Sequence, residues 1–133
     1  MSDPDAPSDV DVVRRIYAAL AERDIVTALS LFDPGCVVVQ DDRLPWGGRF
    51  VGHEGVTEFA IALVTHIDSA VEIEAIFEAD GDVIEVGRTR GTVAGTGTPF
   101  DVAEVHRWTI RDGLAAVAHF SIDTPAMLDA LRA

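Results

Sequence analysis

The sequence contains a single cysteine, Cys36, among its 133 residues. This excludes an internal disulfide and any metal cluster built from several cysteines. Lysine is absent, since all ten basic residues are arginines. No apolar run approaches the roughly 20 residues that a helix needs to span a bilayer. The first residues include neither a basic region nor an apolar core, so no secretory signal is predicted and we expect a cytoplasmic location.

Positive charge is scarce, because 23 acidic residues outnumber the ten basic ones and give a net charge of −13. Such a surface repels phosphate backbones and anionic lipids, so we expect neither a nucleic acid nor a membrane as partner. The apolar fraction of 48% and the mean hydropathy of +0.22 exclude a disordered chain. The acidity favours solubility, and it still permits a local arginine site for an anionic ligand.

Several motifs of known chemistry are missing. The sequence has no GxSxG nucleophile elbow and no phosphate-binding glycine loop. Its four histidines lack the spacing of metal ligands, so neither a metal site nor another cofactor is expected.

Helical patterns occupy the first half of the chain. Ser8 followed by Asp11 predicts a capping box and a first helix. Asp24 is expected to cap a second helix, whose apolar face extends to Phe32. Residues 1–7, acidic and with two prolines, are predicted to be a disordered tail. The other predictions are a strand over 36–40, an irregular loop over 41–52, and a third helix with an apolar face from Val56 to Ile67.

Strand patterns occupy the second half. Apolar and polar residues alternate from Val71, and glycine-containing turns at 80–82, 95–99 and 111–113 separate the runs. The further predicted strands are 83–94, 100–110 and 114–122. Thr124-Pro125, after Asp123, predicts the start of a terminal helix.

This order, α-α-β-α-β-β-β-β-α, predicts an α+β fold in a single domain over residues 8–133. We expect a cone-shaped fold in which a curved antiparallel sheet wraps over the long third helix and leaves a cleft between them.

Two segments resemble the SnoaL-like and ketosteroid-isomerase-like proteins of the nuclear transport factor 2-like superfamily. The run Leu44–Val56, LPWGGRFVGHEGV, is similar to the start of the third helix in SnoaL-like proteins. The runs His106–Leu114 and Phe120–Asp123 are similar to that family's closing hairpin. The resemblance covers roughly residues 10–131 and implies the cone-shaped fold. It implies a range of activities, because the superfamily includes isomerases, polyketide cyclases and non-catalytic carriers.

Comparison with ketosteroid isomerase argues against the same reaction. The base aspartate of that enzyme falls at Gln40, next to Asp41, and its first-helix tyrosine falls at Ile16, next to Tyr17. Its oxyanion-hole acid falls at His106. Because these positions are chemically altered, steroid isomerisation is not expected.

Period-2 alternation predicts which strand side chains enter the cleft. On the strand over 100–110, His106 shares a face with Trp108, which we expect to pack under the helices. On the strand over 83–94, Arg88 aligns with Ile84 and Val86 and is predicted to reach the interior. There it would anchor an anionic substrate or pair with a neighbour such as Glu104.

SnoaL-type cyclases use a histidine and an aspartate for enol chemistry. Here the resemblance implies His106 together with Asp41, Asp42 or Asp123. His106 is otherwise a core histidine, Asp41 and Asp42 are otherwise solvated turn residues, and Asp123 is otherwise a helix cap.

The sequence thus predicts a cofactor-free pocket for a small apolar or polyketide-like molecule. The favoured activity is proton transfer next to a carbonyl, as in a cyclase or isomerase; the alternative is a non-catalytic binding or dimerisation module. The predicted catalytic residues are His106, Asp41, Asp42 and Arg88. The predicted pocket residues are Tyr17, Trp46, Phe50, Phe59, Leu63, Trp108 and Phe120, with Trp46 at the rim. Apolar residues on the outer sheet face, such as Val105, predict a homodimer.

Overall fold

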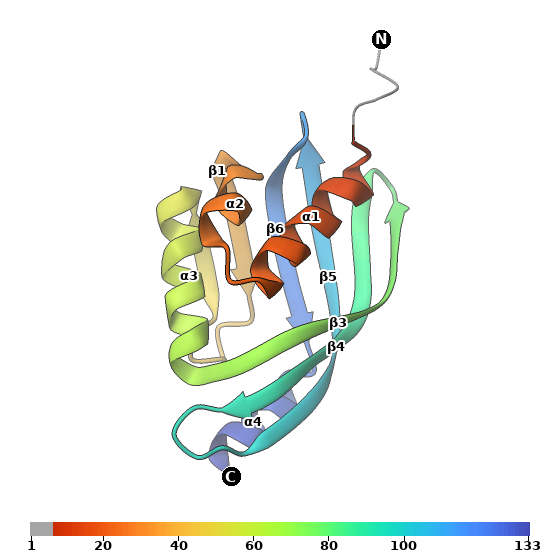
Figure 1. Ribbon diagram of the computed structural model, residues 1–133. Helices are drawn as coiled ribbons and strands as arrows, with labels where there is room; N and C mark the ends of the chain where they lie inside the picture. Colours follow the sequence, from red (N-terminus) through yellow and green to blue (C-terminus); the bar gives the residue numbers. More distant parts are fainter. Residues whose placement is uncertain (1–6) are drawn as a thin grey trace.

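The computed structural model describes residues 7–133, which contain four helices and one six-stranded sheet (Figure 1). The predicted tail over 1–7 lies outside the described residues except for its last position. The elements in chain order are α1 (Asp9–Ala21), α2 (Ile25–Ser30), β1 (Phe32–Gln40), β2 (Gly48–Val51), α3 (Gly52–His66), β3 (Ile67–Ala79), β4 (Asp82–Val93), β5 (Pro99–Arg111), β6 (Leu114–Ile122) and α4 (Thr124–Arg132).

Three helices begin at the predicted caps. The Ser8 hydroxyl accepts a hydrogen bond from the Asp11 backbone N–H, and the Asp11 carboxylate accepts one from the Ser8 N–H. Asp24 and Asp123 accept from backbone N–H groups at the starts of α2 and α4. These caps satisfy backbone donors that would otherwise lack a partner, which fixes where each helix starts.

Two predicted helix ends are wrong. Phe32 was assigned to the second helix and Ile67 to the third, but they are the first residues of β1 and β3. Both side chains are buried, at 4% and 2% exposure. An apolar residue at the right spacing therefore continues the helical pattern, although the backbone has already become extended.

The sheet confirms the predicted α+β class and extends it. The strand order is β2-β1-β6-β5-β4-β3, and all neighbours are antiparallel except β1 and β6, which are parallel. The predicted loop over 41–52 contains the four-residue strand β2, which pairs with the end of β1 and adds a strand to the predicted order. Because β1 and β6 are parallel, the sheet is mixed, and the prediction of a wholly antiparallel sheet is wrong.

The sheet curves strongly where β3 sweeps across β4 (Figure 1). Two glycines of β4 allow this close approach. A Cβ atom at Gly87 would lie 2.1 Å from the Glu72 carbonyl oxygen, and one at Gly91 would lie 1.9 Å from that of Asp68. No side chain fits at those distances, so glycine is required at both positions.

Helices cover the concave face of this curved sheet. The long helix α3 packs against β1 and β2, while α1 packs against β3, β4, β5 and β6. The core between them contains fully buried side chains such as Ile16, Val38 and Trp108. Among the residues described, no helix has the length and apolar character needed to cross a membrane. The candidate functional site lies in the space between these helices and the sheet.

Candidate functional site

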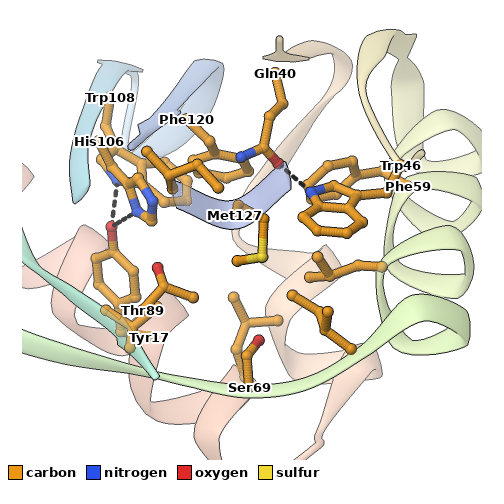
Figure 2. A pocket seen from close by; sticks show the side chains of 15 residues that line it. Tyr17, Gln40, Trp46, Phe59, Ser69, Thr89, His106, Trp108, Phe120 and Met127 are labelled. Carbon is orange, nitrogen blue, oxygen red and sulfur yellow. Dashed lines mark hydrogen bonds between the residues drawn. The ribbon is translucent and has the colours of Figure 1, made fainter. Parts of the chain in front are cut away.

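A cavity of about 120 Å³ lies between the concave face and helices α1 and α3 (Figure 2). Its wall is mostly aromatic and aliphatic. Six of the seven predicted pocket residues line it: Tyr17, Trp46, Phe59, Leu63, Trp108 and Phe120. The seventh, Phe50, does not line the cavity; it packs behind the wall against Phe59, with ring centroids 5.4 Å apart. The cavity is therefore an apolar chamber with a few polar groups at defined places.

Tyr17 is the polar centre of one end of the cavity. It projects from α1, and its hydroxyl oxygen accepts a hydrogen bond of 2.9 Å from the indole N–H of Trp108. The same oxygen lies 2.7 Å from Nδ1 of His106 (Figure 2). Burial raises the pKa of Tyr17, so the phenol keeps its proton at neutral pH. This hydroxyl therefore remains a hydrogen-bond donor.

His106 forms the wall beside Tyr17, on β5, as the alternation predicted. Its side chain is 8% exposed, and burial lowers its pKa to about 3. The imidazole is therefore neutral at pH 7 and has one N–H, on either Nδ1 or Nε2. Its two nitrogens face different partners, because Nδ1 faces Tyr17 and Nε2 lies 3.2 Å from Oε2 of Glu104.

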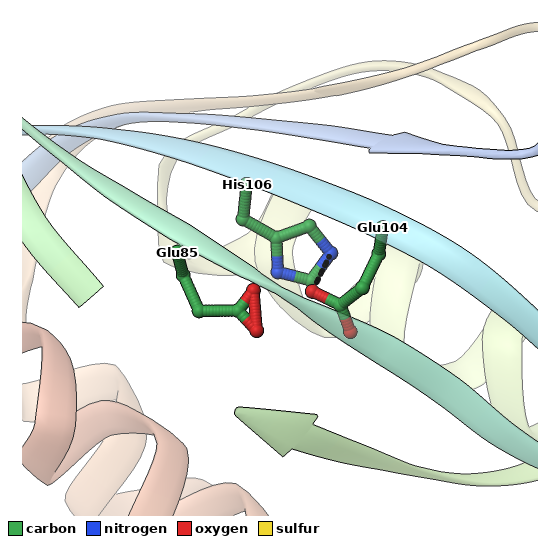
Figure 3. Close-up of side chains that lie close together, drawn as sticks. All are labelled: Glu85, Glu104 and His106. Atoms are coloured by element: carbon green, nitrogen blue, oxygen red, sulfur yellow. Dashed lines mark ion pairs between the residues drawn. The ribbon is translucent and has the colours of Figure 1, made fainter. Parts of the chain in front are cut away.

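Two buried glutamates continue this chain of polar groups behind the cavity wall (Figure 3). Glu104, 2% exposed, accepts a hydrogen bond of 3.0 Å from the Thr89 hydroxyl through Oε1. Glu85, 0% exposed, is paired with His106 in the β4–β5 register. Neither Glu85 oxygen has a hydrogen-bond partner within residues 7–133.

The protonation of the two carboxyls follows from their surroundings. Burial, and next the neighbouring Glu104, raises the pKa of Glu85 to about 9. Burial likewise raises the pKa of Glu104. Two carboxylates this close disfavour simultaneous ionisation, so the pair holds a proton at neutral pH.

Gln40 and Trp46 form the polar pair at the other end of the cavity (Figure 2). The indole N–H of Trp46 donates a hydrogen bond of 2.9 Å to Oε1 of Gln40. This contact leaves the Gln40 amide NH₂ as its remaining donor group. Trp46 is only 1% exposed, so it is an inner wall residue and not the predicted rim.

The family model of the SnoaL-like domain matches residues 13–118 of this chain. The chain belongs to the SnoaL-like domain family. The match runs from α1 into β6, whereas the cavity residues Phe120, Ile122 and Met127 lie beyond it. No curated protein matches the sequence significantly.

Solved structures share the fold of this SnoaL-like domain over nearly its full length. An NTF2-like protein of unknown function from Burkholderia pseudomallei is 25% identical, with 96% of this chain and 100% of that chain covered and a TM-score of 0.87. TerC, co-crystallised with polyporic acid, is 26% identical, with coverages of 94% and 98% and a TM-score of 0.86. A ketosteroid isomerase-like protein from Catenulispora acidiphila, in complex with trimethylamine, shares the fold at 17% identity, with coverages of 98% and 95% and a TM-score of 0.78.

Three predicted catalytic residues of the SnoaL-like domain do not line this cavity. Asp41 forms an ion pair of 2.6 Å with Arg43, which lowers the pKa of Asp41 to about 2, and Asp42 is exposed beside it. The inward orientation predicted for Arg88 is wrong, because Arg88 lies on the outer face and pairs with Asp101. The odd-numbered positions of β4, which include Glu85 and Thr89, face inward instead. Of the four predicted catalytic residues, the structure places His106 alone in the wall.

The sequence did not indicate Glu85 or Thr89 as site residues, and it indicated Glu104 only as a possible partner of Arg88. One signal for Glu104 was present, since a residue two positions before an inward His106 must point inward as well. For Glu85 the signal was misleading. The outer positions of β4 include Ile84 and Val86, so the apolar side chains indicated the wrong face.

Proposed function

We propose that this SnoaL-like domain binds a small apolar molecule with a carbonyl oxygen and catalyses proton transfer next to that carbonyl. The observation that supports it most is the pairing of Tyr17 with His106, 2.7 Å apart, at the end of an otherwise apolar cavity. In such a dry site a fixed hydrogen-bond donor polarises a carbonyl far more than it does in water. Enolisation and ring closure next to a carbonyl both need such polarisation of the carbonyl group.

Tyr17 is the group that touches the substrate oxygen in this proposal. When Nδ1 of His106 bears the imidazole proton, the Tyr17 oxygen accepts from both His106 and Trp108. The phenolic proton then points to the substrate. The Gln40 NH₂ group supplies a second donor at the opposite end.

His106 passes protons between Tyr17 and the carboxyl pair. The α-proton of the substrate leaves to a water molecule. A proton moves from Glu104 to Nε2 while Nδ1 releases one to the Tyr17 oxygen, and the phenolic proton moves to the substrate oxyanion. His106 and Tyr17 each gain one proton and lose one, while Glu104 loses one and the oxyanion gains one. The carboxyls, whose pKa values are raised by burial, are suited to hold this proton at neutral pH.

The size of the cavity limits the substrate. An engineered protein cavity of about 150 Å³ holds benzene, so a cavity of about 120 Å³ suits one ring or a short branched chain. This favours the small members of the polyketide-like class. TerC, which has the same fold and was co-crystallised with polyporic acid, gives support for an organic ligand in this cavity.

Deuterium exchange tests the proposal. Cyclohexanone in D₂O, with a chelator present, is expected to lose its α-proton NMR signals faster with the protein than without it. Tyr17→Phe is expected to slow this exchange about 100-fold, the usual contribution of one general acid or oxyanion donor. Arg88→Gln, on the outer face, is the matched control and is expected to exchange normally.

The alternative of a non-catalytic binding module gives a different result. Its support is the burial of His106, which leaves a weakly basic imidazole. Phenol and toluene, matched in shape, then serve as ligands followed by Trp46 fluorescence in a Trp108→Phe background. Tight binding of phenol over toluene without any exchange of cyclohexanone would establish the module and reject the enzyme.

We also propose that the domain is a homodimer through the outer face of the sheet. Val105, in the middle of β5, is 46% exposed there, and Val117 lies on the neighbouring strand β6. Sedimentation at micromolar concentration is expected to give twice the 14.2 kDa of one chain. A mass of one chain would reject the dimer.

A further inference from the structure

Three buried side chains, Glu85, Glu104 and His106, meet at the cavity wall and directly behind it. Glu85 lies opposite His106 in the β4–β5 register, and Glu104 precedes His106 by two residues on the same face. Each offers one ligand atom, and these atoms lie within 4.8 Å of one another (Figure 3). All three residues are at least nine-tenths buried.

The cluster has an unbalanced charge. Among the described residues, the single basic side chain within ion-pair distance of either carboxyl is His106. Two buried carboxyls without a cation are costly in the ionised form. Both oxygens of Glu85 and one of Glu104 also have no hydrogen-bond partner within residues 7–133.

We propose that Glu85, Glu104 and His106 form a binding site for a divalent transition-metal cation such as Zn²⁺. One imidazole and two carboxylates are ligands that such cations accept, and their two negative charges balance the cation. Ligand atoms about 2.0–2.2 Å from a tetrahedral metal lie about 3.3 Å apart. Nε2 of His106 and Oε2 of Glu104 are already 3.2 Å apart. The Glu85 oxygens accept no hydrogen bond from a described residue, and the Glu85 ligand atom lies within 4.8 Å of the other two.

Two of the three ligands are oriented by a second partner. Thr89 holds Oε1 of Glu104, the oxygen that faces away from Nε2, and Tyr17 lies against Nδ1 of His106. Metal-binding histidines are usually held through their other ring nitrogen in this way, and metal-binding carboxylates are usually hydrogen-bonded too. A cation on Nε2 leaves the imidazole proton on Nδ1. The Tyr17 hydroxyl then donates its own hydrogen toward the cavity. The proton transfer from Glu104 to Nε2 in the proposed function operates only when this site is free of metal.

A shared proton is the other way to neutralise the carboxyl pair, and a metal titration separates the two. Calorimetry with Zn²⁺ at pH 7 is expected to show one saturable site with release of about one proton, because the cation displaces the proton held by the pair. Co²⁺ at the same site is expected to give visible absorption bands. Absence of a saturable site would overturn the proposal and leave the shared proton as the neutralising species.

Matched variants locate the site within an acidic protein that binds cations weakly elsewhere. Glu85→Gln and Glu104→Gln are expected to weaken Zn²⁺ binding at least tenfold. Glu58→Gln removes the same charge from the exposed face of α3 and is expected to leave the affinity unchanged. Equal weakening in all three variants would assign the binding to surface charge and overturn the proposal.

Glu85→Asp guards against a folding defect, since it keeps the charge but withdraws the carboxyl by one methylene. It is expected to weaken Zn²⁺ while its circular dichroism matches the parent, and unchanged affinity would overturn the proposal. The cyclohexanone exchange is measured with a chelator present. Exchange can therefore be observed even if Zn²⁺ does not bind, and Zn²⁺ can bind even if no exchange is observed.

Discussion

The two faces of the β4–β5 hairpin differ in how their charged residues are paired. On the outer face, Arg88 pairs with Asp101 and Arg107 pairs with Asp82, and the arginines are partly exposed to water. On the inner face, Glu85 is fully buried without a hydrogen-bond partner among the described residues. Alternate residues of the same strands thus form ion pairs on the outer face and include a buried carboxyl without an ion-pair partner on the inner face.

This difference shows where the fold gives up stability. A buried carboxyl at the position of Glu85 is destabilising, and an apolar residue of similar size would avoid the cost. Departures of this kind from good packing are typical of functional sites. The pair of Arg88 with Asp101, in contrast, contributes little either way because water and salt screen it.

The largest expected effect is the pH dependence of stability that the inner face imposes. Burial, followed by Glu104, raises the pKa of Glu85 to about 9, from 4.5 in an unperturbed chain. The folded protein holds this proton at pH values where the unfolded chain has released it, so the free energy of unfolding falls as the pH rises. Between pH 7 and 8.5 the loss approaches about 1.4 kcal/mol per pH unit. Urea unfolding with a chelator present measures it.

The choice of pH range separates Glu85 from His106. Burial lowers the pKa of His106 from 6.5 to about 3, so below pH 6.5 the unfolded chain takes up a proton that the folded one refuses, and stability falls with falling pH. Above pH 7 this contribution is constant. Glu85→Gln is expected to flatten the slope there, while Asp101→Asn on the outer face leaves it. A flat wild-type profile would contradict a protonated Glu85.

A smaller effect is expected when the Tyr17 hydroxyl is removed. Tyr17→Phe leaves the Trp108 indole N–H and Nδ1 of His106 without their shared partner. Buried groups that lose a hydrogen bond cost about 1–3 kcal/mol of unfolding free energy. Thr98→Val removes a partly exposed hydroxyl whose partner is the Thr96 hydroxyl; it serves as control and is expected to change stability by less than about 0.5 kcal/mol. Equal effects of the two changes would show that the inner network adds nothing.

The smallest effect is expected on the outer face. Arg88→Gln removes the exposed pair with Asp101, and such pairs contribute about 0–1 kcal/mol. The difference from the parent is expected to shrink further between 0.05 and 1 M NaCl, because salt screens exposed charges. Thermal melts at both salt concentrations measure it. A loss of more than about 2 kcal/mol of unfolding free energy would show that the Arg88–Asp101 pair is structurally important, and the two faces would then not differ as described.

The sequence predicted where the helices and strands lie better than it predicted which side chains face the interior. Helix caps such as Ser8 are local signals, since side chain and backbone partner lie within three residues. The strand β2 was missed because four residues in a glycine-rich segment show no usable alternation. Its pairing with β1 is a tertiary contact, and local sequence does not encode it.

The candidate site was predictable where one strand face is clearly apolar. His106 was placed inward correctly because Trp108 shares its face. Arg88 was placed inward wrongly because β4 has apolar side chains on both faces, and the inner one includes Glu85. A charge on a concave face is rare enough that pattern reasoning assigns it to solvent. The family resemblance gave the fold, while the polar contacts of Tyr17 required coordinates.

The parallel pairing of β1 with β6 has a consequence for the order of folding. It joins positions such as Gln40 and Phe120, about 80 residues apart in the chain, whereas β3 to β6 are linked by short hairpins. Closing so long a loop is slow, so we expect the meander to form first and β1 to dock last. Gln40 and Phe120 are both wall residues of the cavity. On the ribosome, the cavity is therefore expected to form only after β6, the last strand, has emerged.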